Sequence, residues 1–155
     1  MSRAFVKEQE EAEPLNELPD REISQHPNFV TAEGLAAIEA ELERVQRDHA
    51  QARAAGDRGQ IASTGRDLRY WSARRSTAQI VAAPKDADKV HFGSTVTIDR
   101  DDGRRQTFRI VGEDEADPAK GTLSHAAPLA RALAGKTIGD VVRAGNADAE
   151  IVAIT

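Results

Sequence analysis

The chain has 155 residues, a net charge of −5 and no cysteine. A chain of this length forms one or two small domains, and without cysteine it has no disulfide bond, thiolate metal ligand or thiol nucleophile. No apolar run approaches the ~18 residues of a membrane-spanning helix, and the N-terminus lacks the apolar core of a signal peptide. We therefore expect a cytoplasmic protein that makes no contact with a membrane.

Residues 1–28 are acidic, with seven carboxylates against three basic side chains, and prolines interrupt them. Apolar residues are few, so burial cannot offset the entropy lost when the segment becomes ordered. We expect an acidic, mobile tail, with Leu15, Leu18 and Ile23 as the candidates for contact with the rest of the chain.

Residues 29–84 carry two apolar patterns with helical three- and four-residue spacing. The two seams are Leu35, Ile38, Leu42, Val45, His49 and Ala52, and then Ile61, Thr64, Leu68, Trp71, Arg75, Ala78 and Ala82. Each seam is too narrow to stabilise a helix alone, and Gly56–Asp57–Arg58–Gly59 supplies a reversal between them. The pattern predicts an antiparallel helical hairpin running from Thr31 to about Val81. A helix pair within a larger bundle is the alternative, but the sequence has no third helix of similar length.

Residues 85–155 change to the alternating pattern of β-strands. Pro128 can begin a short helix that Gly135 ends. Strands with one inserted helix predict a small α+β domain, separate from the hairpin. The expected strands are 90–92, 95–98, 107–111, 122–124, 141–143 and 150–154.

A sequence match to a nucleotide-binding motif fails on its context. Residues 130–137 nearly spell a P-loop, but Ala130 replaces the first glycine, and the Gly-Lys-Thr follows a helix where phosphate binding needs a strand before it. The four histidines lie in different elements without the spacing of metal ligands. We expect no catalytic residue and no self-contained hydrolase or transferase site.

The outer part of the hairpin is rich in arginine, unlike the rest of the chain. These guanidinium groups can meet nucleic-acid phosphates or the acidic wall of a channel, although a solvated helix face is the simpler interpretation. Tyr70 and Trp71 can add stacking, but Trp71 at a seam position more often belongs to a core. The basic hairpin face comprises Arg58, Arg66, Arg69, Arg74 and Arg75.

Asp57 at the reversal has two interpretations. Aspartate is a common turn former. A carboxylate at the end of a basic hairpin can also deliver an oxygen ligand to Mg²⁺ in another protein's active site. We expect no cofactor of the chain's own, and Mg²⁺ only as an ion shared with such a partner.

The C-terminal half resembles the Gre family of bacterial transcript-cleavage and elongation factors. About 60 residues carry the likeness in family order: Phe92-Gly-Ser-Thr-Val-Thr, the run F-R-I-V-G-E-D-E-A-D from Phe108 to Asp117, the segment from Ser124 to Lys136, and Gly139-Asp-Val-Val142. The resemblance implies an FKBP-like domain with an antiparallel sheet that docks on RNA polymerase at its secondary channel, with the coiled coil projecting into that channel. Residues 1–28 look like an unrelated extension.

The resemblance also implies which residues contact the polymerase. The loop from Glu113 through Asp114 and Glu115 to Asp117, together with Ser124 and Pro128, matches the part of the family's domain that makes the docking contact. The family's Ser-Pro pair is Ala127-Pro128 in this chain, which departs from the pattern.

The hairpin tip departs further. Cleavage-active family members carry an Asp followed three residues later by a Glu, whereas this chain has Asp57 and then Gln60. A neutral amide is a poor ligand for a hard cation, and an arm of about 22 residues rises only ~33 Å. A tip that stops short cannot place Asp57 on the metal.

Three functions remain open at this point. The first is a monomeric RNA polymerase-binding regulator that occupies the secondary channel, near nascent RNA, with weak or no stimulation of cleavage. The second is an active cleavage factor that uses Asp57 to help hold Mg²⁺ in the polymerase. The third is an FKBP-like binding or prolyl-isomerase module, which Phe92 and Phe108 alone support poorly because such sites need an aromatic-lined pocket.

Overall fold

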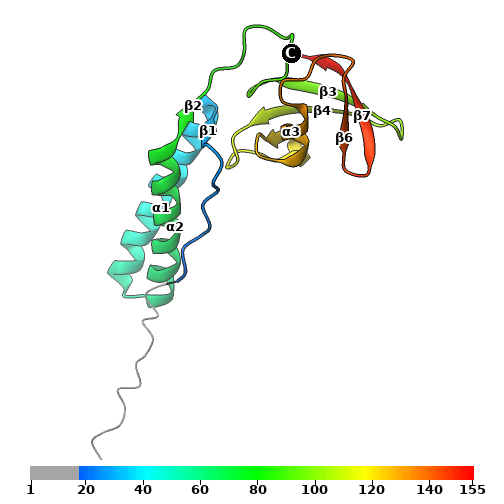
Figure 1. The fold of residues 1–155 in the computed structure, drawn as a ribbon. Coiled ribbons are helices and arrows are strands. Elements are labelled where there is room, and N and C mark those ends of the chain that lie inside the picture. The colour runs from blue at the N-terminus through cyan, green and yellow to red at the C-terminus, as the bar shows by residue number, and fades with distance from the viewer. Residues whose placement is uncertain (1–17) are drawn as a thin grey trace, which may run out of the picture. The chain divides into compact units, whose positions relative to one another are not determined.

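The structure, a computed structural model, describes residues 18–155 (Figure 1). These residues divide into two compact units. One contains residues 18–23 and 40–73, and the other contains residues 24–39 and 74–155. The first unit is therefore the outer part of a helical hairpin, while the second combines the base of that hairpin with a β domain.

Two antiparallel helices, α1 (Ala32–Ala55) and α2 (Arg58–Thr77), form the predicted hairpin (Figure 1). Gly56 makes the reversal with a positive φ of 66°, a conformation that costs glycine little. Ile38, Val45 and Ala52 of α1 are buried along the predicted seam. The spacing of apolar residues therefore identified the face that packs.

The second arm ends earlier than predicted. It is helical from Arg58 onward, through the weak helix former Gly65, and it ends at Thr77 instead of near Val81. The Asn28 side-chain amide donates to the Arg74 carbonyl at 2.8 Å and to the Thr77 hydroxyl at 3.1 Å, which satisfies groups at the helix end.

The chain beyond α2 pairs with the chain that precedes α1. Strand β2 (Gln79–Ile80) lies parallel to β1 (Phe29–Val30). Pairing across about 50 residues is a tertiary effect, and the local pattern that predicted helix at Gln79 and Ile80 gave the wrong structure there.

The seam also slips by one residue near the base. Arg75, predicted to lie on the seam, is exposed, whereas Arg74 is only 2% exposed. The predicted basic face therefore loses one member, because Arg74 points into the protein instead of toward solvent.

The β domain is a five-stranded sheet in the order β5-β4-β3-β7-β6. All neighbouring pairs are antiparallel except β4 and β5. The strands are β3 (Thr95–Arg100), β4 (Arg105–Val111), β5 (Thr122–Ser124), β6 (Val141–Ala144) and β7 (Ala147–Ile154). The α+β class predicted from the sequence is confirmed.

A short helix, α3 (Pro128–Leu133), packs against the sheet and closes the core (Figure 1). Its Ala130 and Leu133 are buried with Val96, Ile98 and Ile151 of the sheet. The predicted strand at 90–92 is wrong. Val90 instead exchanges hydrogen bonds with the loop after α3, through the Gly135 amide and the Lys136 carbonyl.

None of the helices in the described part of the chain is long and apolar enough to cross a membrane.

Candidate functional site

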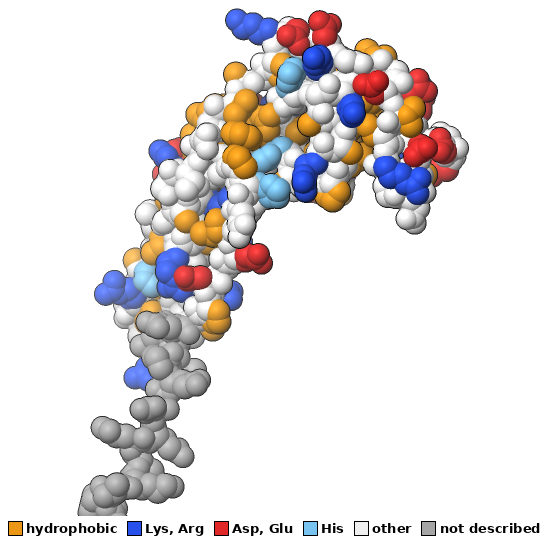
Figure 2. All heavy atoms as spheres, viewed as in Figure 1, with side chains coloured by type: hydrophobic (Ala, Val, Ile, Leu, Met, Phe, Trp, Pro, Cys, Tyr) orange, Lys and Arg blue, Asp and Glu red, His pale blue; other side chains and the backbone are white. Residues whose placement is uncertain are grey.

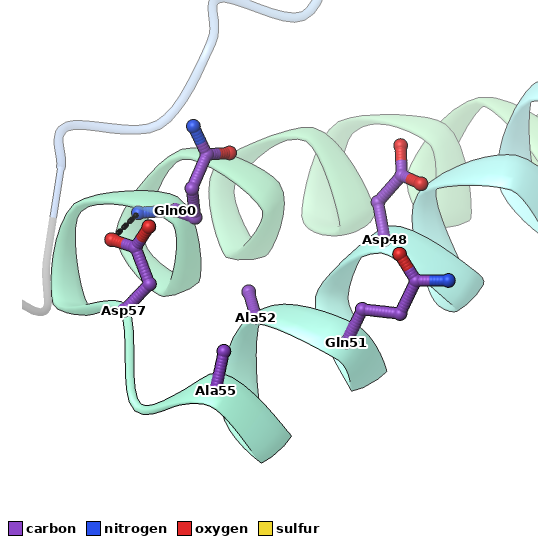
Figure 3. A pocket seen from close by; sticks show the side chains of 6 residues that line it. All are labelled: Asp48, Gln51, Ala52, Ala55, Asp57 and Gln60. Carbon is purple, nitrogen blue, oxygen red and sulfur yellow. Dashed lines mark hydrogen bonds between the residues drawn. The ribbon is translucent and has the colours of Figure 1, made fainter.

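Asp57 at the hairpin tip is the N-cap of α2. Its side-chain oxygen accepts the Gln60 backbone N–H at 3.2 Å (Figure 3). The Asp57 carbonyl accepts the Ile61 N–H at 2.8 Å. Asp at the N-cap with Gln three residues later is the sequence pattern of a capping box. The structure therefore shows Asp57 capping α2 at the turn, as expected of a turn-forming aspartate.

A shallow cavity of about 340 Å³ lies beside this cap (Figure 3). Its polar lining combines the carboxylates of Asp48 and Asp57 with the amides of Gln51 and Gln60. Asp48 is already paired with Arg44 at 2.9 Å. Within residues 18–155, no cluster of three or more His, Cys, Asp and Glu side chains can hold a metal ion. Asp57 therefore belongs to no such cluster among these residues.

The arginines predicted to form one basic face differ in exposure, and Arg74 is buried. Arg58 and Arg75 are exposed, and Arg75 pairs with Glu39 at 2.8 Å. Arg69 is exposed and Arg66 is half-buried. Figure 2 shows acidic as well as basic side chains along the hairpin, so the face is not of one sign.

Tyr70 and Trp71 are half-buried and form an edge-to-face pair, with ring centroids 5.0 Å apart. Arg21, from the segment predicted to be a mobile tail, lies over the Tyr70 ring at 3.8 Å. No local pattern predicts this contact, because it joins residues 49 positions apart.

The loop after β4 contacts the base of the hairpin. Arg74 pairs with Asp114 at 2.5 Å and with Glu113 at 3.5 Å. Its guanidinium also donates to the Asn28 side-chain oxygen at 2.8 Å. Buried charge is tolerated when it is paired and hydrogen-bonded in this way, so this loop is held at the point where α2 ends.

Glu115 caps α1 from the same loop. The Thr31 hydroxyl accepts the Gly34 N–H at 2.9 Å, and the Glu115 carboxylate accepts the Thr31 hydroxyl at 2.6 Å and its N–H at 3.3 Å. In a capping box the residue at N3 is a glutamate, but here it is Gly34, and Glu115 makes the contact with Thr31 in its place. Among the predicted docking residues, Glu113, Asp114 and Glu115 all contact the hairpin base.

Asp117, Ser124 and Pro128 make local contacts within the β domain. Asp117 caps the short 3₁₀ helix Pro118–Lys120 by accepting the Ala119 N–H at 3.1 Å. The Ser124 hydroxyl accepts the Ala126 N–H at 3.1 Å, and Pro128 opens α3. Asp117 and Ser124 are half-exposed and Pro128 is exposed, so these three leave surface for a partner.

A second cavity, of about 180 Å³, lies in the unit that contains the β domain and is lined by rings that include Phe29, Phe92 and His125. Burial lowers the pKa of His125, while the Glu113 carboxylate and the Pro27 carbonyl favour the protonated ring. The Nε2 atom of His125 is buried without a hydrogen-bond partner. The cavity is smaller than the ~300–1,000 Å³ typical of ligand pockets. Sequence reasoning missed Phe29 and His125 as lining residues.

Neither cavity holds the constellation of an enzyme. The cavity at the tip is lined by Asp57, which caps α2, and by Asp48, which pairs with Arg44. The ring-lined cavity is lined by His91 and His125, and burial lowers the pKa of His125. The fold is a helical hairpin followed by a small β domain.

Comparison with known proteins identifies the class of protein to which the chain belongs. Residues 84–155 match the family described as "Transcription elongation factor, GreA/GreB, C-term". The chain is 36% identical over 135 residues to transcription elongation factor GreB of Haemophilus influenzae, covering 75% of this chain and 85% of that protein. It is 40% identical over 141 residues to GreA of Legionella pneumophila, covering 77% and 87%. The chain belongs to the GreA/GreB family of transcription elongation factors, which are not themselves enzymes.

Solved structures of lower similarity include the GreA factor homolog 1 protein of Thermus thermophilus, 20% identical, with a TM-score of 0.41 over 84% of this chain and 99% of that one. A GreA/GreB factor from Nitrosomonas europaea is 18% identical, with a TM-score of 0.42 over 82% and 98%.

Proposed function

We propose that this chain binds RNA polymerase in the cytoplasm through its C-terminal domain and inserts the hairpin into the secondary channel, with weak or no stimulation of transcript cleavage. Membership of a family of transcription elongation factors supports binding to polymerase. The composition of the tip supports the weak cleavage.

Docking uses the two groups of predicted residues differently. Asp117, Ser124 and Pro128 lie at least partly at the surface and contact the polymerase directly. Glu113, Asp114 and Glu115 engage Arg74 and Thr31, so they act by holding the docking loop at the base of the hairpin.

The observation that carries the weak cleavage is the pairing of Asp57 with a neutral Gln60. One oxygen of Asp57 already accepts the Gln60 N–H, and the Gln60 amide adds no charge with which to bind Mg²⁺. Helix α1 has 24 residues and is therefore only about 36 Å long. The tip supplies one carboxylate ligand, whereas a second metal ion needs more than one ligand to be held firmly.

The Gln60→Glu variant tests this reading. Glutamate keeps the capping-box pattern and restores the second tip carboxylate, so the fold is retained while the charge changes. We expect the variant to raise the rate of transcript cleavage in a backtracked elongation complex by at least about tenfold. Gln51→Glu, which adds the same charge to the same cavity from α1, is the matched control and should leave the rate unchanged. Equal rates for wild type and Gln60→Glu would contradict the role assigned to the neutral Gln60 and would leave the length of the hairpin as the reason for weak cleavage.

A second candidate function is active cleavage that depends on Asp57. The observation in its favour is that Asp57 is exposed and retains free acceptor positions after capping α2. In that case Asp57 contributes one ligand to Mg²⁺ and the polymerase supplies the others. Cleavage by the wild type that is lost in Asp57→Asn would favour this candidate.

A further inference from the structure

The segment from Leu18 to Ile23, called the strap below, lies along α2 in the outer unit of the hairpin. Asp20 pairs with Arg69 at 2.5 Å, and Arg21 pairs with Asp67 at 3.1 Å. Two neighbouring strap residues, one acidic and one basic, thus pair with a basic and an acidic residue of α2 that lie two positions apart. This reciprocal pairing fixes one register of the strap on α2.

Arg21 also stacks on the aromatic pair of α2. Its guanidinium carbon lies 3.8 Å from the Tyr70 ring centroid and 5.7 Å from that of Trp71. A planar cation over an aromatic face is a favourable contact. The strap therefore covers both the charged group and the stacking surface that this part of α2 presents.

The two strap side chains occupy the positions of the two parts of a nucleotide. The Asp20 carboxylate lies on Arg69 as a phosphate oxygen would, and the planar Arg21 group lies over Tyr70 as a base would. Arginine with neighbouring aromatic rings is the combination that binds single-stranded nucleic acid without regard to sequence. We propose that Arg69, Tyr70 and Trp71 form a binding surface for single-stranded RNA and that the strap masks it.

The strap is held to α2 by weak contacts that a ligand can displace. Leu18 and Ile23 are 38% and 44% exposed, so apolar burial does not hold the segment. The Asp20 and Arg69 side chains are 72% and 48% exposed, and exposed ion pairs are weak and screened by salt. An RNA strand that offers phosphate and base together can compete for such contacts. In the context of the proposed function, which this inference deepens, the competing strand is the transcript.

Trp71 is the single tryptophan of the chain and reports the position of the strap. Quenching of Trp71 fluorescence by acrylamide should increase in Arg21→Gln and in Asp20→Asn, because both substitutions loosen the strap. Glu22→Gln is the matched control. It removes the same charge as Asp20→Asn from an exposed position next to Arg21, and it should leave quenching at the wild-type level.

Binding of a fluorescent single-stranded RNA oligonucleotide to the same full-length proteins tests the masking. We expect Asp20→Asn and Arg21→Gln to tighten binding by about 3- to 10-fold, as loss of one exposed ion pair or stack predicts. Glu22→Gln should change it by less than about twofold. Tyr70→Leu in the Asp20→Asn background should reverse the gain, because it removes the stacking surface.

Several results would overturn the inference. Equal gains in Asp20→Asn and Glu22→Gln would show a general charge effect without a strap. Increased Trp71 quenching with unchanged RNA binding would show that the strap masks nothing that binds RNA, and competition by poly-glutamate as strong as that by RNA would show that the surface reads charge alone. Neither assay contains polymerase, so a chain that fails to bind polymerase leaves both readouts intact.

Discussion

Gly34 and Glu115 show how one missing side chain is replaced from a distant part of the sequence. A β-carbon at Gly34 would lie 1.8 Å from a Glu115 carboxylate oxygen. The space that an alanine would fill is therefore the space in which Glu115 reaches the Thr31 cap. The incomplete capping box noted in the sequence is completed by tertiary structure.

Gly34→Ala is expected to lower the free energy of unfolding by about 1–3 kcal/mol, because the added methyl group forces Glu115 out of its place. Urea denaturation measures the change. Gly59→Ala is the matched control. A β-carbon there lies 3.7 Å from its nearest neighbour, an Asp57 oxygen, so helix propensity should make this variant up to ~1 kcal/mol more stable. A Gly34→Ala protein as stable as wild type would contradict the account of the cap.

His125 makes stability depend on pH. Its pKa is lowered chiefly by burial, so the unfolded chain binds the proton more readily than the folded one. The free energy of unfolding should therefore fall as the pH drops through the ordinary histidine value of ~6.5, and the fall should cease below the lowered pKa of the folded state. Urea denaturation between pH 5 and 8 measures this slope.

His125→Gln should flatten that slope, whereas His91→Gln, at an exposed histidine, should preserve it. An unchanged slope in His125→Gln would show that another group causes the pH dependence. The groups that face His125 include His26, Glu113 and Arg74.

At the scale of elements, Arg74 and Arg75 are neighbours in sequence with opposite environments. Arg74 is 2% exposed and pairs with Asp114, which is 9% exposed, whereas Arg75 and its partner Glu39 are 48% and 45% exposed. Helix periodicity places adjacent residues about 100° apart, so one register decides which of them is buried. The register was predicted one residue off.

Arg74→Met should lower the free energy of unfolding by about 3–5 kcal/mol, because the Asp114 carboxylate loses this cation in a buried site. Arg75→Met, the same substitution one residue on, should cost no more than about 1 kcal/mol. Thermal and urea denaturation of the two variants give the comparison. Equal losses would mean that Arg74 is not the residue that holds the docking loop to the hairpin.

The elements that depend on the local spacing of apolar residues were predicted correctly. The hairpin followed from apolar spacing and the Gly56 turn, and most strands of the β domain from alternation. Local pattern did not predict the parallel pair β1–β2 or the pairing of Val90 with the loop after α3, because both join segments far apart in sequence.

The candidate site was less accessible to prediction than the fold. Asp57 was identified from its place at the reversal, but the internal use of Glu113, Asp114 and Glu115 depends on which side chains face the hairpin base. Pairing of Asp20 and Arg21 with α2 had no periodic signal at all. Side-chain contacts between residues 40 or more positions apart cannot be predicted from the local pattern of a single sequence.

At the scale of the whole molecule, the account rests on separating binding from cleavage. The C-terminal domain belongs to a family of transcription elongation factors, while the tip offers one carboxylate that also caps a helix. Such a chain should occupy the polymerase channel and compete with other channel-binding factors without promoting RNA hydrolysis efficiently.

The most direct test is transcript cleavage in a backtracked elongation complex with polymerase from the same organism. Wild type and Asp57→Ala are compared at a concentration where stoichiometric binding has been confirmed. The account predicts that both proteins bind and that neither shortens the RNA appreciably faster than polymerase alone. Rapid shortening by wild type that disappears in the bound Asp57→Ala variant would contradict it and make the chain a cleavage factor with a single tip carboxylate.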